Sequence, residues 1–183
     1  PLAEYARTLL RRSNATRMLG LIKESQEDAE EVLRLTKNSI DLLNLQAEAH
    51  RSMGNNYQME GLASEALHSY ERSLIIYQQL NDHHNTAVLL METGVVLMSL
   101  GDYAGAESSY TLALSHWQTV GNYVWQSNLL NNLGVLQHLR GNYESALTTL
   151  EKAIEYAHLS LMSRAEAYEL VSIGDIYHDL DAF

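Results

Sequence analysis

Apolar residues recur every three or four positions between residues 129 and 157, which is the spacing of one face of an α-helix. The pattern is interrupted once, at Gly141-Asn142, where a glycine typical of helix ends precedes a residue that commonly caps a helix start. The stretch therefore predicts a helix, a tight turn and a second helix. The apolar positions are Leu130, Leu133, Leu136 and Leu139, followed by Tyr143, Ala146, Leu147, Leu150 and Ile154.

Glycine and alanine positions repeat this pattern along the chain with a period of 40 residues. Such a period indicates an array of one repeated unit. Glycine inside a helix costs about 1 kcal/mol relative to alanine, so its recurrence in the first helix of each unit predicts a close helix crossing. The alanines of the second helix are the expected facing residues. The three series are Gly54, Gly94, Gly134 and Gly174, then Gly61, Gly101 and Gly141, and then Ala66, Ala106 and Ala146.

The predicted units follow one another without a linker rich in Pro, Gly or Ser, through turns near Asn81-Asp82 and Gly121-Asn122. At the N-terminus, a helix over residues 2–20 and a second over 24–43 complete one more pair. The predicted fold is therefore all-α, with antiparallel helix pairs stacked in a single array. The units span residues 2–43, 44–82, 83–122, 123–162 and an incomplete 163–183.

In its motif residues the chain resembles the tetratricopeptide repeat (TPR) family. One unit carries Leu130, Leu133-Gly134, Gly141-Asn142-Tyr143, Ala146, Leu150 and Ala153, and the unit before it carries Leu90, Thr93-Gly94, Leu97, Gly101-Asp102-Tyr103, Ala106, Tyr110 and Ala113. The resemblance implies a right-handed superhelix. The chain departs from the family in its longer period, against roughly 34 residues, and in lacking a proline after the second helix.

The run from Leu129 to Ala157 is similar to the TPR sensor regions of large bacterial transcriptional regulators, of the maltose-activator-like and antibiotic-regulatory types. This resemblance implies an interaction or effector-sensing module that binds a peptide or protein segment, from another protein or another domain of the same parent. The alternative is a scaffold or adaptor that assembles a multiprotein complex unrelated to transcription. The chain starts with proline and stops where a second helix is expected, so we interpret it as a piece of a longer protein.

Composition further reduces the range of functions expected for the chain. The net charge of −11 argues against nucleic acid as a partner, because nucleic-acid binding needs a basic surface. No apolar run is long enough to predict a membrane span, and the absence of cysteine fits the cytoplasm. The sequence holds no phosphate-binding glycine loop and no recognisable nucleophile motif, so we expect neither an enzyme nor a cofactor. The histidines are interpreted as solvated, not as metal ligands.

In the family, side chains of the first helix of each unit line a concave groove. The corresponding residues here form an apolar, methionine-containing centre flanked by hydrogen-bonding side chains, which favours an apolar or amphipathic segment as ligand. The alternative is that a neighbouring helix covers Met91, Val95 and Met98. The predicted groove residues are Arg51, Asn55, Gln58, Val88, Met91, Val95, Met98, Asn131, Val135 and His138.

The last predicted helix, over residues 163–180, has no partner helix in the sequence. Its apolar residues would leave an exposed patch, and such patches drive association. We therefore expect self-association through this helix. The residues concerned are Tyr168, Leu170, Ile173 and Tyr177.

Overall fold

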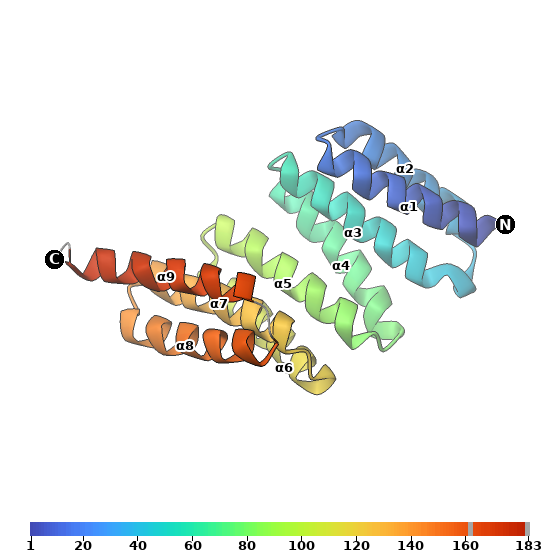
Figure 1. Ribbon diagram of the computed structural model, residues 1–183. Helices are drawn as coiled ribbons and strands as arrows, with labels where there is room; N and C mark the ends of the chain where they lie inside the picture. Colours follow the sequence, from blue (N-terminus) through green and yellow to red (C-terminus); the bar gives the residue numbers. More distant parts are fainter. Residues whose placement is uncertain (161–162, 182–183) are drawn as a thin grey trace. The chain divides into compact units, whose positions relative to one another are not determined.

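The computed structural model describes residues 1–160 and 163–181, with side chains for 1–160 and 170–180. Over these residues every regular element is helical, which confirms the predicted all-α class (Figure 1). The elements are α1 (Leu2–Met18), α2 (Ile22–Thr36), the short 3₁₀ helix η1 (Ile40–Leu42), α3 (Leu43–Met59), α4 (Ala63–Gln79), α5 (His83–Ser99), α6 (Tyr103–Val120), α7 (Tyr123–Leu139), α8 (Tyr143–Leu159) and α9 (Ser163–Asp181).

The chain divides into two compact units, Pro1–Val96 and Leu97–Phe183, so that the division falls within α5. Each unit is built from helix pairs joined by short turns, as the repeat period predicts. That the units form one continuous, right-handed array stays a prediction.

In the first unit, α1 and α3 lie side by side, and α2 and α4 cover one side of that layer (Figure 1). Residues of α1, α2 and α3 form one part of the core: Ala6, Leu9, Leu10, Val32, Leu45 and Ala49. Residues of α3, α4 and α5 form another: Ala47, Ala66, Tyr70, Tyr77, Leu89 and Val96. These buried positions recur at helical spacing, so hydrophobic burial is the main force that pairs the helices.

The second unit holds α6 to α9, with α7 packed against α6, α8 and α9. The rings of Trp117 and Trp125 stack with their centroids 5.1 Å apart, which joins α6 to α7. Gln126 strengthens this contact because its amide donates to the backbone oxygen of Trp117 at 3.2 Å. Around α8, the core consists of Ala146, Leu150 and Ile176, with Ile173 packed against them.

The turn between α7 and α8 shows how the glycines end helices. Gly141 has a φ of 75°, a left-handed conformation that costs other residues energy. Asn142 follows at the N-cap of α8, but its side chain makes no capping hydrogen bond, contrary to the expectation. Capping side chains are present instead at the starts of α6 and α7, where Asp102 accepts from the Gly105 amide and Asn122 from the Trp125 amide.

The predicted helix over residues 24–43 is wrong at its end, because α2 stops at Thr36 and α3 starts at Leu43. The side-chain amide of Gln46 explains the early stop. It donates to the backbone oxygens of Thr36 at 2.8 Å and Ser39 at 3.2 Å. Helix ends leave carbonyl oxygens without partners, and Gln46 satisfies them at a point where the chain turns.

Two of the mid-helix glycines, Gly54 and Gly134, lie at close crossings, but the facing residue differs from the expected alanine. The atoms nearest to a Cβ built on Gly54 belong to Tyr70, and those nearest to a Cβ on Gly134 belong to Leu150. Ala66 and Ala146 are fully buried one turn earlier. A glycine is therefore needed because a large side chain of the second helix lies directly over it.

Among the described residues, no side chain covers the face of α9 around Gly174, since a Cβ built there would meet none of their atoms within 4 Å. Leu170 and Tyr177 are exposed on this helix, and Ile173 is half-buried against α8. The side chain of Tyr168 lies outside the described residues. Self-association through α9 stays a prediction.

Candidate functional site

A cavity of about 300 Å³ opens between the helices of the first unit. Residues of α1 and α3 line it at intervals of three or four positions, so each helix presents one face to the cavity. Tyr77 of α4 and Asn85 of α5 close it. The lining residues are Leu10, Asn14, Arg17, Glu48, Arg51, Ser52, Asn55, Tyr77 and Asn85.

Arg51, a predicted groove residue, is held by Glu92 of α5. Its Nε donates to Glu92 Oε2 at 2.9 Å and its second guanidinium nitrogen donates to Oε1 at 2.5 Å. Both side chains are less than one-third exposed. Such a forked pair restricts the guanidinium to one orientation, so Arg51 is a structural link between α3 and α5 as well as part of the cavity wall.

Asn55 and Gln58, also predicted, both contact the buried hydroxyl of Tyr70. The hydroxyl lies 2.6 Å from Asn55 Oδ1 and 2.9 Å from Gln58 Oε1. A hydroxyl has a single proton and can donate to only one of these oxygens, so one of the two amides must be turned to donate its NH₂ to the hydroxyl. Burial raises the pKa of Tyr70, which therefore keeps its proton.

Tyr77 lines the cavity although the residue is almost wholly buried. The residue is 2 % exposed. Burial, and secondarily the neighbouring charge of Glu48, raise the pKa of Tyr77, so its hydroxyl stays protonated and can donate a hydrogen bond. Tyr77 was not among the predicted groove residues.

On α5 the predicted residues differ in exposure. Val88 is 2 % exposed and lies in the interior. Met91, Val95 and Met98 are half-buried. Because the division between the two units falls within this helix, whether these three residues form an open groove stays a prediction.

In the second unit, Asn131 and His138 of α7 are bound to α9, while Val135 is half-buried between them. The hydroxyl of Ser172 donates to Asn131 Oδ1 at 2.9 Å. His138 Nε2 lies 2.8 Å from Asp179 Oδ2. The hydrogen bond with His138 lowers the pKa of Asp179. These two contacts attach α9 to α7 along the predicted groove face.

The polar contacts between successive first helices share one sequence separation. Arg51 and Glu92 are 41 residues apart, and so are Asn131 and Ser172. Arg51 and Asn131 occupy the same position of the repeat, two periods apart. The repeat period could have indicated these pairs. A residue and its contact on the first helix of the following unit are 41 residues apart, one more than the period of 40.

Sequence reasoning missed the part of the cavity that α1 contributes, chiefly Asn14 and Arg17. The repeat register is weaker near the N-terminus, so α1 was assigned no groove residues. The sequence could still have indicated Asn14, because it precedes Asn55 by 41 residues, the same separation as in the contacts between the other first helices.

Among the described residues, no group of three or more His, Asp or Glu side chains is arranged to hold a metal ion. His138 and His178, one period apart, both approach Asp179. None of the described helices combines the length and apolar character needed to cross a bilayer.

Comparison with known proteins supports the repeat assignment. Residues 85–157 match the family model described as tetratricopeptide repeat. No curated protein sequence matches the chain.

Solved structures match nearly the whole chain. The crystal structure of BtubC (BKLC) from P. vanneervenii has a TM-score of 0.82 at 16 % identity, covering 97 % of this chain and 73 % of that one. The apo form of RapI has a TM-score of 0.83 at 19 % identity, covering 98 % and 69 %.

A third similar structure is a signal transduction ATPase with numerous domains and a tetratricopeptide repeat sensor, from Pyrococcus horikoshii. Its TM-score is 0.79 at 18 % identity, over 94 % of this chain and 27 % of that protein. At such identities the likeness shows the fold alone. The similarity to the tetratricopeptide repeat family is thus one of sequence over residues 85–157, and the solved structures extend it as a likeness of fold to nearly the whole chain.

Proposed function

We propose that this chain binds a peptide or a segment of another protein domain along the faces of its first helices, and that the cavity of the first unit anchors the ligand. The observation that carries the proposal is the cavity itself, where hydrogen-bonding side chains from α1, α3, α4 and α5 converge. A pocket with a few convergent polar groups is the usual form of a binding site.

The chemistry of the wall suits an extended polypeptide. Asparagine amides such as those of Asn14 and Asn55 can both donate and accept, and can therefore pair with backbone amide groups of a ligand. Met91 and Met98 on α5 supply flexible apolar side chains that adapt to different ligand residues. The function is thus binding, without a chemical step and without a cofactor.

We further propose that the module is the sensing part of a larger cytoplasmic regulator of the bacterial type. In this proposal the segment itself binds neither nucleic acid nor membrane. The likeness to an ATPase with a tetratricopeptide repeat sensor supports this setting. The flanking sequence of the parent gene tests it. An ATPase module and a DNA-binding domain beside the repeats would support the sensor, whereas further adaptor repeats alone would favour a scaffold.

The binding site itself is tested with peptides selected from a random display library on the purified chain. We expect the selected peptides to bind at least about tenfold more weakly to Asn55→Ala and to the Met91→Asp, Met98→Asp double variant. The control is Met18→Asp, which adds one carboxylate at a side chain 83 % exposed on α1 and outside the cavity lining.

Circular dichroism and the thermal unfolding midpoint verify that each variant is folded. If the folded variants keep full affinity for every selected peptide, the groove is not the binding site. If Met18→Asp alone loses affinity, the site lies at the turn between α1 and α2.

A further inference from the structure

The cavity of the first unit contains a cation that no carboxylate neutralises. Arg17 is half-buried, and its one hydrogen bond is from a terminal guanidinium nitrogen to Asn14 Oδ1 at 3.2 Å. Its Nε is buried and has no acceptor among the described residues. Arginine is rarely buried without a partner, because removing a guanidinium from water is costly.

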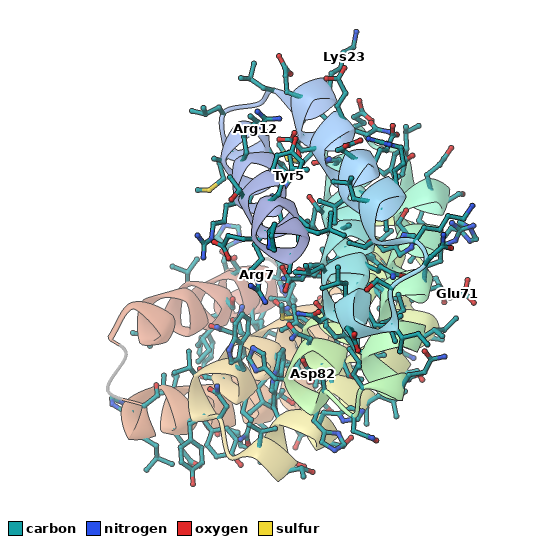
Figure 2. All side chains as sticks on the ribbon, turned by 90° about the vertical axis from the view of Figure 1, so that its right-hand side faces the viewer. Tyr5, Arg7, Arg12, Lys23, Glu71 and Asp82 are labelled. Atoms are coloured by element: carbon teal, nitrogen blue, oxygen red, sulfur yellow. The ribbon has the colours of Figure 1, made fainter. Side chains whose placement is uncertain are left out.

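Other arginines of this unit contrast with Arg17. Arg51 is paired with Glu92, and Arg12, which lies toward the turn between α1 and α2 in Figure 2, is paired with Asp28. Among the described ion pairs none includes Arg17. Of the two arginines in the cavity wall, Arg51 is thus paired with a carboxylate, whereas Arg17 has no carboxylate partner among the described residues.

A second donor residue, Tyr77, lines the same cavity. Tyr77 is 2 % exposed and belongs to the cavity wall, and burial raises its pKa so that the hydroxyl keeps its proton. A protonated hydroxyl of this kind can donate a hydrogen bond to a group bound in the cavity.

The nearby amides also offer donors. Asn14 already accepts from Arg17 through Oδ1, which leaves its NH₂ group for the cavity. Asn85 has the opposite arrangement, because its Nδ2 donates to Asp82 Oδ2 at 2.7 Å and its oxygen remains. Together with Arg17 and Tyr77, these amides give the wall several donors, which suit a group rich in acceptor oxygens.

We infer that the cavity binds an oxyanion carried by the ligand segment, either a side-chain carboxylate or a phosphate group. The inference rests on the proposed function and names the chemistry of the residue that occupies the cavity. Charge-assisted hydrogen bonds from Arg17 and a bond from Tyr77 would satisfy both donors at once. At about 300 Å³ the cavity holds an acidic side chain together with water.

Glu48 on the same wall limits the affinity of the site. Its carboxylate repels an anion, so only a group that reaches Arg17 and the donors around it gains enough to bind. Replacement of Glu48 by glutamine removes this repulsion with little change in shape, and it should therefore strengthen oxyanion binding.

The first test uses the purified chain and small probes. The Nε–H resonance of Arg17 is followed by NMR during titration with acetate, inorganic phosphate and the neutral acetamide, at constant ionic strength. We expect saturable shifts with acetate or phosphate and none with acetamide. Whichever anion binds more tightly identifies the source of the oxyanion. No saturable shift with either anion overturns the inference.

Variants then show which side chains bind the anion. Arg17→Gln should weaken anion binding by about tenfold or more, Tyr77→Phe by about fivefold, and Glu48→Gln should strengthen it. Anion binding to the Arg17 variant is followed through the side-chain amide of Asn14. Arg11→Gln is the matched control, because it removes an exposed charge from the same helix outside the cavity wall. Equal affinity in the Arg17 and Arg11 variants overturns the inference, and so does weaker binding to Glu48→Gln.

The second test separates this inference from the proposed function. Peptides selected on the chain are compared with versions in which each Asp or Glu is replaced by Asn or Gln, and with phosphoserine versions. We expect one acidic or phosphorylated position whose loss weakens binding about tenfold, and only when Arg17 is present. Peptides that bind through Asn55 but are insensitive to these replacements would overturn the oxyanion inference and leave the proposed function standing.

Discussion

Leu150 of α8 lies directly against Gly134 of α7, so that a Cβ added to this glycine would be 2.6 Å from the Cγ of Leu150. Tyr70 of α4 has the same relationship to Gly54 of α3, two periods earlier. The repeat therefore places a large side chain of one helix over a glycine of the helix before it. This contact sets how closely the two helices of a pair approach.

Gly134→Ala should lower the free energy of unfolding by about 1–3 kcal/mol, because Leu150 or the backbone must move to admit the new methyl group. Gly174→Ala is the matched control at the same repeat position on α9, where a Cβ would meet no atom within 4 Å. There alanine should stabilise the helix by up to about 1 kcal/mol. Thermal or urea unfolding measures both changes, and equal effects at the two sites would contradict the account of the crossing.

The Arg51–Glu92 pair should couple α3 to α5. Because both side chains are less than one-third exposed, removing one partner leaves the other partly desolvated and unpaired. We expect Arg51→Met and Glu92→Gln each to cost about 2 kcal/mol of stability and the double variant to cost less than their sum. Urea unfolding of the four proteins gives the coupling energy. Strict additivity would show that the pair contributes nothing.

Ser13 joins three helices through a buried hydroxyl. Its Oγ lies 2.7 Å from Ser52 Oγ of α3 and 2.9 Å from the backbone oxygen of Ser25 of α2, to which it donates. Ser13→Ala should cost about 1–3 kcal/mol, because Ser52 and Ser25 lose a buried partner. Thr8→Ala, at an exposed hydroxyl on the same helix, should change the unfolding midpoint little. Similar losses at both sites would contradict the role of Ser13.

Attachment of α9 to α7 should depend on pH at acidic values. The hydrogen bond from His138 lowers the pKa of Asp179 in the folded protein. A lowered carboxyl pKa contributes stability that is present above the unfolded value, about 3.9, and is lost as pH falls through the folded value. Carboxyl-carbon NMR should give a pKa for Asp179 below 3.9 in the native chain.

His138→Phe removes the hydrogen bond while keeping a ring of similar size, and it should raise the pKa of Asp179 toward its ordinary value. Asp175 is the internal comparison, an exposed carboxylate on the same helix. A pKa of Asp179 that does not respond to the substitution would show that the bond with His138 is absent in solution.

Local periodicity determined the helices of this protein. The apolar spacing, the turn glycines and the 40-residue period depend on residues close in sequence, so the helix pairs and the positions of their turns could be predicted from them. One helix end could not be predicted in this way, because its cause lies outside its own segment. The early end of α2 depends on Gln46, which binds Thr36 and Ser39 from the next helix.

Tertiary structure decided which side chains meet. The periodicity placed Arg51 and Asn55 on one face, but only the packed helices joined Arg51 to Glu92 and Asn55 to Tyr70. Arg17 is the clearest example of a contact pattern that the sequence could not predict. Its sequence neighbours give no sign that it lacks an acidic partner, because pairing depends on which helices lie within about 4 Å of the guanidinium, and that distance exists only in the folded chain.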